Sequence, residues 1–254
     1  GLLAANERQL NYVRSRMSRF IEQEGALEAS IAAMERGVRK APLNRSYREL
    51  LAWLYMEAEA FDKAFDTYLA IDRLEKENGR VLFEFAQRAA DAAAYEVALK
   101  AFQEILDRYP DAPVAPEVQM GLATMHERWA AKSRERIFDD RGNRLDAPHY
   151  DASLDAYRAF LQKYPNHASY PEALRRIGHL QQDVFFNLDE ANATLSEVAE
   201  RYPNSDAAFQ ARFDLGREAF VDEVWSYVDE TGATPIQRTI YTVPAAGGQP
   251  ARLL

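Results

Sequence analysis

Apolar and polar side chains alternate with helical spacing most clearly in the stretch YEVALKAFQEILDRYP, residues 95–110. Four apolar side chains recur there at intervals of three or four residues: Tyr95, Ala98, Phe102 and Ile105. This spacing places them on one face of a helix. Pro110 cannot continue a helix, so the pattern predicts a helix that ends near residue 108. A helix with one apolar stripe needs another helix to cover that stripe.

The same order of large, small, large and medium-sized side chains recurs four more times along the chain. Two copies lie 34 and 68 residues earlier: Phe61, Ala64, Tyr68, Ile71 and Leu27, Ser30, Met34, Gly37. Two copies follow: Tyr150, Ser153, Tyr157, Phe160 and Leu188, Ala191, Leu195, Val198. Supersecondary units that recur in this way predict a stack of helix pairs in which neighbours cover each other's apolar faces.

The spacing of apolar residues predicts the helices pair by pair. The expected pairs are 2–23 with 26–40, 46–58 with 61–76, 80–92 with 95–108, and 169–185 with 188–201. Asn44 or Ser46 is expected to cap the helix at 46–58. A longer final helix at 206–230 is expected to cap the end of the stack. Residues 231–254, with a short β-like run at 239–243, are interpreted as a tail or the start of a further segment.

The fourth pair is interrupted by about twenty extra residues. Its first helix is expected to begin near Pro116 and its second helix near residue 130, yet the aromatic residue of the second helix is Tyr150. Residues 131–149 are therefore an insertion between the two helices, with a reverse turn expected at Gly142-Asn143. Two interpretations stay open for this insertion: a specific contact with another molecule, or a tolerated surface excursion.

A 34-residue helix-turn-helix period with these side chains resembles the tetratricopeptide repeat. The resemblance implies an all-α, right-handed solenoid within residues 1–230, with five repeats at about 11–44, 45–78, 79–112, 113–167 and 168–205. The Tyr-Pro helix endings at 109–110, 164–165 and 202–203 are similar to those of a bacterial cell-envelope subclass. That subclass includes the TolA-binding periplasmic protein and the lipoprotein of the outer-membrane β-barrel assembly machinery. It implies the periplasm or cell envelope as the compartment.

Composition excludes several classes of function. The chain has 254 residues, no cysteine and a formal net charge of −9. The absence of cysteine excludes disulfides and thiolate metal sites, and the negative charge argues against nucleic acid as a partner. No window approaches 18 consecutive apolar residues, so no membrane span is expected. The first repeat is nevertheless locally basic, and its cations form either a solvated face or a contact surface: Arg14, Arg16, Arg19, Arg36, Arg39 and Lys40.

Catalytic and metal-binding signals are thin. The sequence holds no zinc-protease, phosphate-loop or serine-hydrolase motif. The four histidines lack ligand spacing: His126, His149, His167 and His179. The acidic stretch around Asp139 and Asp146 does not fit the twelve-residue calcium loop. We therefore expect no enzymatic activity, no cofactor and no metal site.

Binding of a protein or peptide is the function that the resemblance implies. In this family the first helix of each pair lines a concave groove, and its inward positions carry over to a defined set. These residues are Arg16, Arg19, Glu49, Trp53, Glu57, Phe83, Gln87, Asp91, Gln119, Leu122 and His126. Trp53 is either an anchor for a bound segment or a residue that packs between adjacent helices. Some relatives grip a C-terminal carboxylate with Lys and Asn, but the matching positions here are Ser15, Arg19 and Leu50, so that mode is not expected.

Two hypotheses for function follow. The first is a scaffold that binds a peptide or protein segment in its groove, within a bacterial envelope assembly. The alternative is a structural or oligomerisation subunit of a larger complex that uses the insertion and the terminal helix. The sequence alone does not name the partner, the compartment or the oligomeric state.

Overall fold

The computed structural model describes residues 7–216, 240–242 and 251–253. These residues form two compact units, which are described separately. Unit 1 comprises Gly1–Glu135 and Ala147–Ala159, and unit 2 comprises Arg136–Asp146 and Phe160–Leu254. Both units are built from helices, which confirms the all-α helical-repeat fold expected from the sequence.

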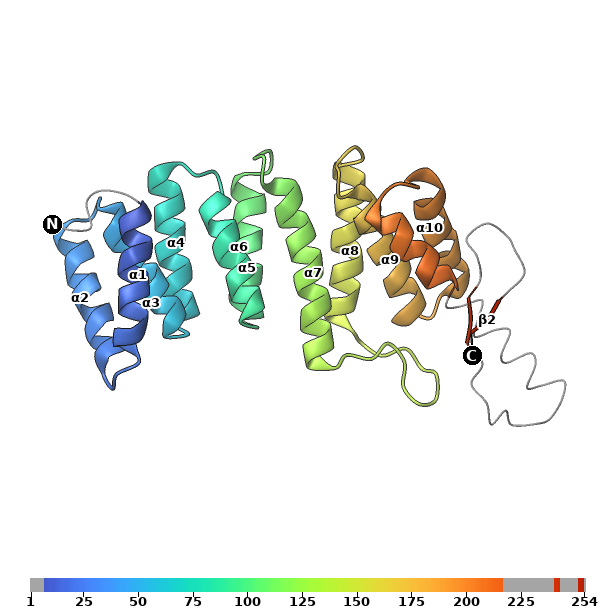
Figure 1. Cartoon of the computed structure of the whole chain (residues 1–254), viewed down its shortest axis with the longest axis horizontal. Helices are drawn as coiled ribbons and strands as arrows, with labels where there is room; N and C mark the ends of the chain where they lie inside the picture. The colour runs from blue at the N-terminus through green and yellow to red at the C-terminus, as the bar shows by residue number, and fades with distance from the viewer. Residues whose placement is uncertain (1–6, 217–239, 243–250, 254) are drawn as a thin grey trace. The chain divides into compact units, whose positions relative to one another are not determined.

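Unit 1 consists of antiparallel helices that follow one another in sequence order (Figure 1). They are α1 (Glu7–Ile21), α2 (Ala26–Lys40), α3 (Arg45–Glu57), α4 (Phe61–Glu75), α5 (Arg80–Asp91), α6 (Tyr95–Arg108), α7 (Ala115–Ser133) and the first part of α8 (Pro148–Lys163). Each helix from α1 to α6 contacts the next one along the chain, and α1 also contacts α3, as α5 contacts α7. The first helices of the pairs are therefore α1, α3, α5 and α7.

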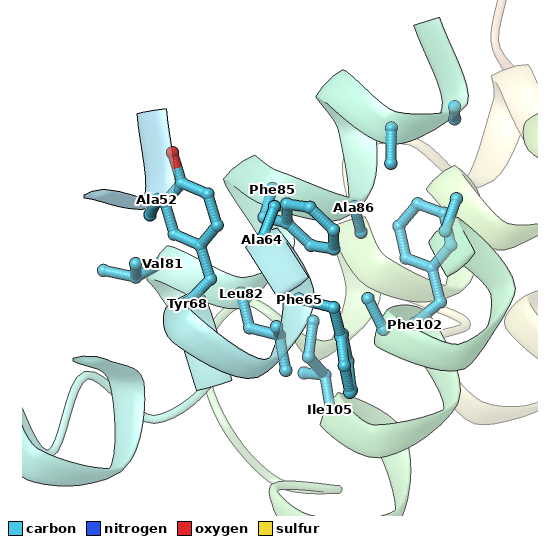
Figure 2. Close-up of a cluster of buried hydrophobic side chains, with 14 of the residues drawn as sticks. Ala52, Ala64, Phe65, Tyr68, Val81, Leu82, Phe85, Ala86, Phe102 and Ile105 are labelled. Carbon is cyan, nitrogen blue, oxygen red and sulfur yellow. The ribbon is translucent and has the colours of Figure 1, made fainter. Parts of the chain in front are cut away.

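The core of unit 1 is made of the repeated apolar positions (Figure 2). Ala64 and Ala98, the small members of two copies, have no exposed surface, and Phe102 and Ile105 are equally inaccessible. A small side chain at this position lets neighbouring helices approach closely, because interaxial distance depends on the residues at the contact. The helical register expected from the sequence is therefore confirmed in unit 1.

The turns of unit 1 are fixed by polar contacts to the backbone. The side chain of Asn44 accepts a hydrogen bond from the backbone N–H of Tyr47, which identifies Asn44 as the N-cap of α3 and places Ser46 inside the helix. The buried carboxylate of Asp72 accepts the backbone N–H of Gly79 at 3.0 Å from each oxygen. Gly79 has φ of 89°, a left-handed conformation that glycine adopts without strain.

Unit 2 holds the last described helix pair. Its helices are α9 (Tyr170–Asp183) and α10 (Leu188–Arg201), together with the end of α8 and helical residues 206–216. Its core joins Leu174, Leu195 and Val198 to Ala207, Ala208 and Ala211. β1 (Ile240–Thr242) and β2 (Ala251–Leu253) pair antiparallel, which confirms strand conformation within the run expected at 239–243. The remainder of the expected capping helix, residues 217–230, lies outside the described residues.

The insertion folds as a short hairpin in unit 2. α7 extends to Ser133, three residues into the expected insertion, so the non-helical insertion is shorter than 131–149. Backbone hydrogen bonds join Leu145 to Ile137 and Asp139 to Asn143, and the expected reverse turn includes Gly142 with φ of 79°. Hydrogen bonds donated by Asn143 to its carboxylate hold the pKa of Asp139 below its usual value.

Candidate functional site

A groove of about 540 Å³ opens in unit 1 between α5 and α7. Its lining residues are Glu84, Gln87, Arg88, Ala90, Asp91, Phe102, Gly121, Thr124, Met125 and Arg128. α5 and α7 are the first helices of adjacent pairs, and Phe102 comes from α6. The groove therefore lies on the side of the stack where the family resemblance predicts a binding surface.

The floor of the groove is apolar and deeply buried. Phe102 and Met125 are each 1% exposed, and Ala90 is almost as deeply buried. Gly121 lets α7 approach this floor closely, because a Cβ at that position would lie 3.1 Å from Cε1 of Phe102 and 3.3 Å from Cε2 of Phe83. An apolar floor of this kind suits an aliphatic side chain of a ligand.

The walls of the groove are polar. Arg128 Nη1 on α7 donates to Asp91 Oδ1 on α5 at 2.7 Å, which joins the two helices at one end of the groove. Glu84 pairs with Arg80, one turn earlier on α5, at 2.9 Å. Arg88 is exposed and makes no ion pair with any residue that the structure describes. The groove thus combines internally paired charges with one cation that has no carboxylate partner.

Unit 1 also holds a buried hydroxyl, that of Tyr68 on α4, without a hydrogen-bond partner among the described residues. Burial raises the pKa of Tyr68, and the positive charges of Arg88 and Arg14 oppose that rise with smaller effects. Arg14 on α1 donates from Nη2 to the backbone oxygen of Glu49 at 3.1 Å, but its buried Nε is also without a partner. Two buried donors of unit 1, the Tyr68 hydroxyl and Arg14 Nε, are therefore without a hydrogen-bond partner among the described residues.

The structure brings three of the residues expected from the sequence to this groove. Gln87 and Asp91 line it, and Phe83 lies beneath it with its ring 6.1 Å from that of Phe102. Leu122 is half-buried and packs against the core of unit 1. Gln87, Asp91 and Phe83 all belong to α5, the first helix of the third pair.

The other expected residues of α7 are engaged in packing. Gln119 donates from Nε2 to the backbone oxygen of Ala156 at 3.1 Å. His126 is 8% exposed, and its ring stacks on Trp129 and His149 with centroid distances of 6.2 Å and 5.7 Å. Burial, followed by the charge of His149, lowers the pKa of His126 to about 4.

The expected residues of α1 and α3 lie outside the groove. Trp53 is half-buried against the cluster that contains Leu10, Leu50 and Leu54. Glu49 forms an ion pair with Arg45 at 2.8 Å. The remaining residues expected on these two helices have exposed side chains: Arg16, Arg19 and Glu57.

The sequence interpretation missed several lining residues, chiefly on α7. That helix presents Gly121, Thr124, Met125 and Arg128 to the groove. The 34-residue offset from Gln87 and Asp91 on α5 leads to Gly121 and Met125, which do line the groove. The residues expected on α7 lie one or two positions beyond that offset. On α5 the missed residue Arg88 directly follows the expected Gln87. The sequence feature that could have identified Arg88 is a positively charged residue at the edge of the apolar face of α5.

The described residues form neither a membrane-spanning helix nor a cluster of metal ligands. None of their helices combines the length and the apolar character that a membrane crossing requires. No group of three or more His, Asp or Glu side chains in residues 7–216, 240–242 and 251–253 is arranged to hold a metal ion.

A family model for the tetratricopeptide repeat matches residues 172–205, which cover most of α9 and all of α10. The chain contains a tetratricopeptide repeat. The tetratricopeptide period of 34 residues also separates the starts of α4 and α6 in unit 1, at Phe61 and Tyr95. A search of curated proteins finds no match to the sequence.

Several solved structures of tetratricopeptide-repeat type are similar to this chain. They include YrrB, described as a TPR protein with an unusual peptide-binding site (15% identity, 81% of this chain and 89% of that chain, TM-score 0.44). A tetratricopeptide repeat protein from Parabacteroides merdae ATCC 43184 shows 14% identity over 89% of this chain and 80% of that chain, with a TM-score of 0.43. MamA from Desulfovibrio magneticus RS-1, from residue 41 to its end, shows 10% identity over 78% and 96%, with a TM-score of 0.42.

Proposed function

We propose that unit 1 is a non-enzymatic protein-interaction scaffold that binds an extended peptide or protein segment in the groove between α5 and α7. The observation that carries this proposal is the groove itself, with its apolar floor at Phe102 and Met125 and its polar walls. Its volume of about 540 Å³ lies within the range of about 300–1,000 Å³ found for ligand pockets.

The groove offers two kinds of contact to a bound segment. The floor accepts an apolar side chain, which contributes roughly 1.5–3 kcal/mol on full burial. The amide of Gln87 and the hydroxyl of Thr124 on opposite walls are able to hydrogen-bond a peptide backbone. Because Thr124 is itself held by the backbone oxygen of Met120 and the hydroxyl of Tyr157, its position is fixed before a ligand arrives, which lowers the entropic cost of binding.

A displayed library of random twelve-residue peptides, selected against the immobilised chain, tests this proposal. We expect binders to be recovered, and a Gln87→Trp substitution that fills the groove to weaken them at least tenfold. Gln103→Trp is the matched control, because Gln103 is exposed on α6 and does not line the groove. Equal binding by the two variants, or no binders at all, would contradict the proposal.

Substitutions at the first pairs of helices show how far a bound segment extends. Trp53→Ala and Arg19→Glu are expected to weaken the recovered peptides only where the segment reaches α1 and α3. If shortening the hairpin abolishes peptide binding while Trp53→Ala and Arg19→Glu leave it unchanged, that result would favour the alternative function described next.

The alternative function is assembly through unit 2, and the hairpin favours it. Phe138 of the hairpin lies with its ring 6.4 Å from that of Phe186, which is 66% exposed. Phe186 has φ of 53° and lies two residues before the start of α10. Glu59 and Ala93 also have positive φ and lie at the same position before α4 and α6. A left-handed conformation costs a bulky residue roughly 1–2 kcal/mol, so an exposed phenylalanine there indicates a contact surface. Light scattering of the wild type and of Phe138→Ser/Phe186→Asn tests it: assembly predicts an oligomer that the double variant loses.

The envelope compartment is part of the proposal for the scaffold. It rests on the Tyr-Pro helix endings, two of which follow α6 and α10. Fractionation of the source cells checks it, with recovery in the periplasmic or membrane fraction as the expected result. Recovery in the cytoplasmic fraction alone would contradict the compartment but leave the groove proposal standing.

A further inference from the structure

Two large apolar side chains are exposed on the last described helix of unit 2. Residues 206–216 are helical, and Phe209 and Phe213, one turn apart on this helix, are 69% and 67% exposed. The other side of the helix packs into the core of unit 2 through Ala208 and Ala211. Single exposed apolar residues are normal, but adjacent large ones mark a contact surface. The two phenylalanines therefore form an apolar face that the described residues leave largely uncovered.

The preceding repeat shows what Phe213 faces. Ala173 on α9 and Ala211 are both fully buried and lie 38 residues apart, as do the Tyr-Pro endings that precede the two helices. The same offset leads from Arg175 of α9 to Phe213. Arg175 contacts the next first helix, where its Nη1 lies 3.7 Å from Asp214 Oδ2. Phe213 thus faces the place that the first helix of a further pair takes in a stack of repeats.

α1 has a similar apolar face on its side of unit 1. Tyr12 and Phe20 are 64% and 49% exposed, and the exposed Arg16 lies between them on the same side of the helix. The 34-residue period leads from Phe20 to Leu54 of α3. Leu54 has no exposed surface, because it packs in the cluster that contains Leu10 of α1. Phe20 therefore faces the place that a preceding first helix takes in a stack of repeats.

The two faces are complementary in position. Among the described residues, α1 is a first helix with no helix before it, and helical residues 206–216 are a first helix with no helix after them. Repeats stack through contacts between successive first helices, as α1 contacts α3 and α5 contacts α7. In a second copy of the chain, α1 is therefore the kind of helix that residues 206–216 lack as a neighbour.

Charge favours the same pairing. α1 carries Arg14, Arg16 and Arg19, and residues 10–21 contain no acidic side chain. α10, which packs against helical residues 206–216, carries four acidic residues and one arginine: Asp189, Glu190, Glu197, Glu200 and Arg201. Complementary charges steer two surfaces together, and like charges disfavour the wrong partner. A basic α1 face is therefore attracted to the acidic end of another copy and repelled by a second α1 face.

We propose that copies of this chain associate head to tail, with the α1 face (Tyr12, Arg16 and Phe20) of one copy covering the 206–216 face (Phe209 and Phe213) of the next. Because the two faces differ, a dimer keeps one free face of each kind, so association continues beyond two copies into a ring or a filament. The contact involves neither the groove between α5 and α7 nor the hairpin.

Mixing two blocked variants of the full chain tests this inference. Tyr12→Ser/Phe20→Ser blocks the α1 face, and Phe209→Ser/Phe213→Ser blocks the 206–216 face. In sedimentation velocity from about 1 µM to about 1 mM, we expect the wild type to grow beyond a dimer and each variant alone to stay a monomer. Their equimolar mixture is expected to form a dimer with one copy of each and nothing larger, because each variant retains one intact face.

Matched variants assign the effect to these faces. Leu43→Ser/Leu74→Ser removes two leucines that are 80% and 47% exposed and belong to neither face, and we expect it to assemble as the wild type does. Arg16→Glu reverses a charge within the α1 face and is expected to raise the dissociation constant at least fivefold. Lys132→Glu, a charge reversal at an exposed position of α7, should stay within twofold of the wild type. Circular dichroism confirms that each variant is folded.

Several outcomes overturn the inference. They are a wild type that is monomeric over the whole range, a mixture that stays monomeric or grows beyond a dimer, and equal effects of Arg16→Glu and Lys132→Glu. If residues 217–254 of the same chain cover the 206–216 face, Phe209→Ser/Phe213→Ser loses stability in urea while the wild type is monomeric. Assembly that survives both blocked variants and is lost in Phe138→Ser/Phe186→Asn places the contact at the hairpin instead.

Discussion

Asp91 on α5 and Arg128 on α7 join two adjacent repeats across the candidate groove, with Oδ1 and Nη1 2.7 Å apart. Both side chains are well exposed, at 70% and 43%. An exposed ion pair contributes little to stability, about 0–1 kcal/mol. We expect its larger effect to be on the groove, because it links the two helices that line the opening.

Asp91→Ala separates these two effects. We expect the free energy of unfolding to fall by no more than about 1 kcal/mol, as measured by urea denaturation. At the same time the link between α5 and α7 across the groove is lost, so the affinity for a peptide recovered from the library, measured by fluorescence anisotropy, is expected to fall. Arg128→Gln removes the same ion pair and is expected to lower the affinity to a similar extent. An unchanged affinity in both variants would contradict this account.

Ala98→Leu tests the helix packing in unit 1. Ala98 has no exposed surface, so three further carbon atoms must displace its neighbours, at a cost of about 1–3 kcal/mol. Gln103→Leu, on the exposed face of the same helix, is expected to change stability by less than about 0.5 kcal/mol. Thermal unfolding measures both, and similar melting temperatures would mean that the register of α6 is wrong.

Gly79 and Gly142 distinguish backbone strain from crowding. Both have positive φ, 89° and 79°. A Cβ on Gly79 would lie 2.6 Å from Cγ2 of the buried Ile105, whereas a Cβ on Gly142 meets nothing within 4 Å. Gly142→Ala is expected to cost about 1 kcal/mol from strain alone, and Gly79→Ala about 2–4 kcal/mol from strain and overpacking. Equal losses in urea denaturation would show that crowding at Ile105 is absent.

His126 is expected to make stability depend on pH. Its pKa is lowered from 6.5 to about 4 by burial and by His149. Between these two pH values, His126 is neutral in the folded chain and protonated in the unfolded chain. Its contribution is therefore fully present above about pH 6.5 and is lost as the pH falls towards 4.

His126→Gln removes this group and should show a smaller fall in the urea midpoint between pH 7.5 and pH 5 than the wild type. His179→Gln is the control, because the side chain of His179 lies at the surface of α9 and is 36% exposed. An unchanged pH dependence in His126→Gln would contradict the assignment.

The helices were predictable because their signal is local. Apolar residues three or four positions apart define a helical face whatever the rest of the chain does, and α2, α4, α5 and α6 match their expected bounds within one residue. The end of α7 was harder to predict, because its last three residues lie in the stretch that the repeat pattern assigns to the insertion. The hairpin that follows α7 depends on contacts of Asp139 that no periodicity indicates.

The candidate site was only partly predictable. Gln87 and Asp91 follow from the repeat positions, but Arg88 differs from Arg128 only in what surrounds it. Arg128 meets a carboxylate 37 residues away in sequence, and Arg88 meets none in the described residues. Such pairings depend on how neighbouring helices pack, so the sequence alone does not distinguish a paired cation from a free one.

The sequence by itself determined the repeat, the helical faces and the small residues at which helices cross. These features depend only on side-chain size and on spacing within one continuous segment of the chain. The tertiary structure decided which charges are neutralised, which hydroxyl is left without an acceptor and where the groove lies. Those properties arise between helices that are distant in sequence, where a shift of one residue along a helix turns a side chain by about 100°.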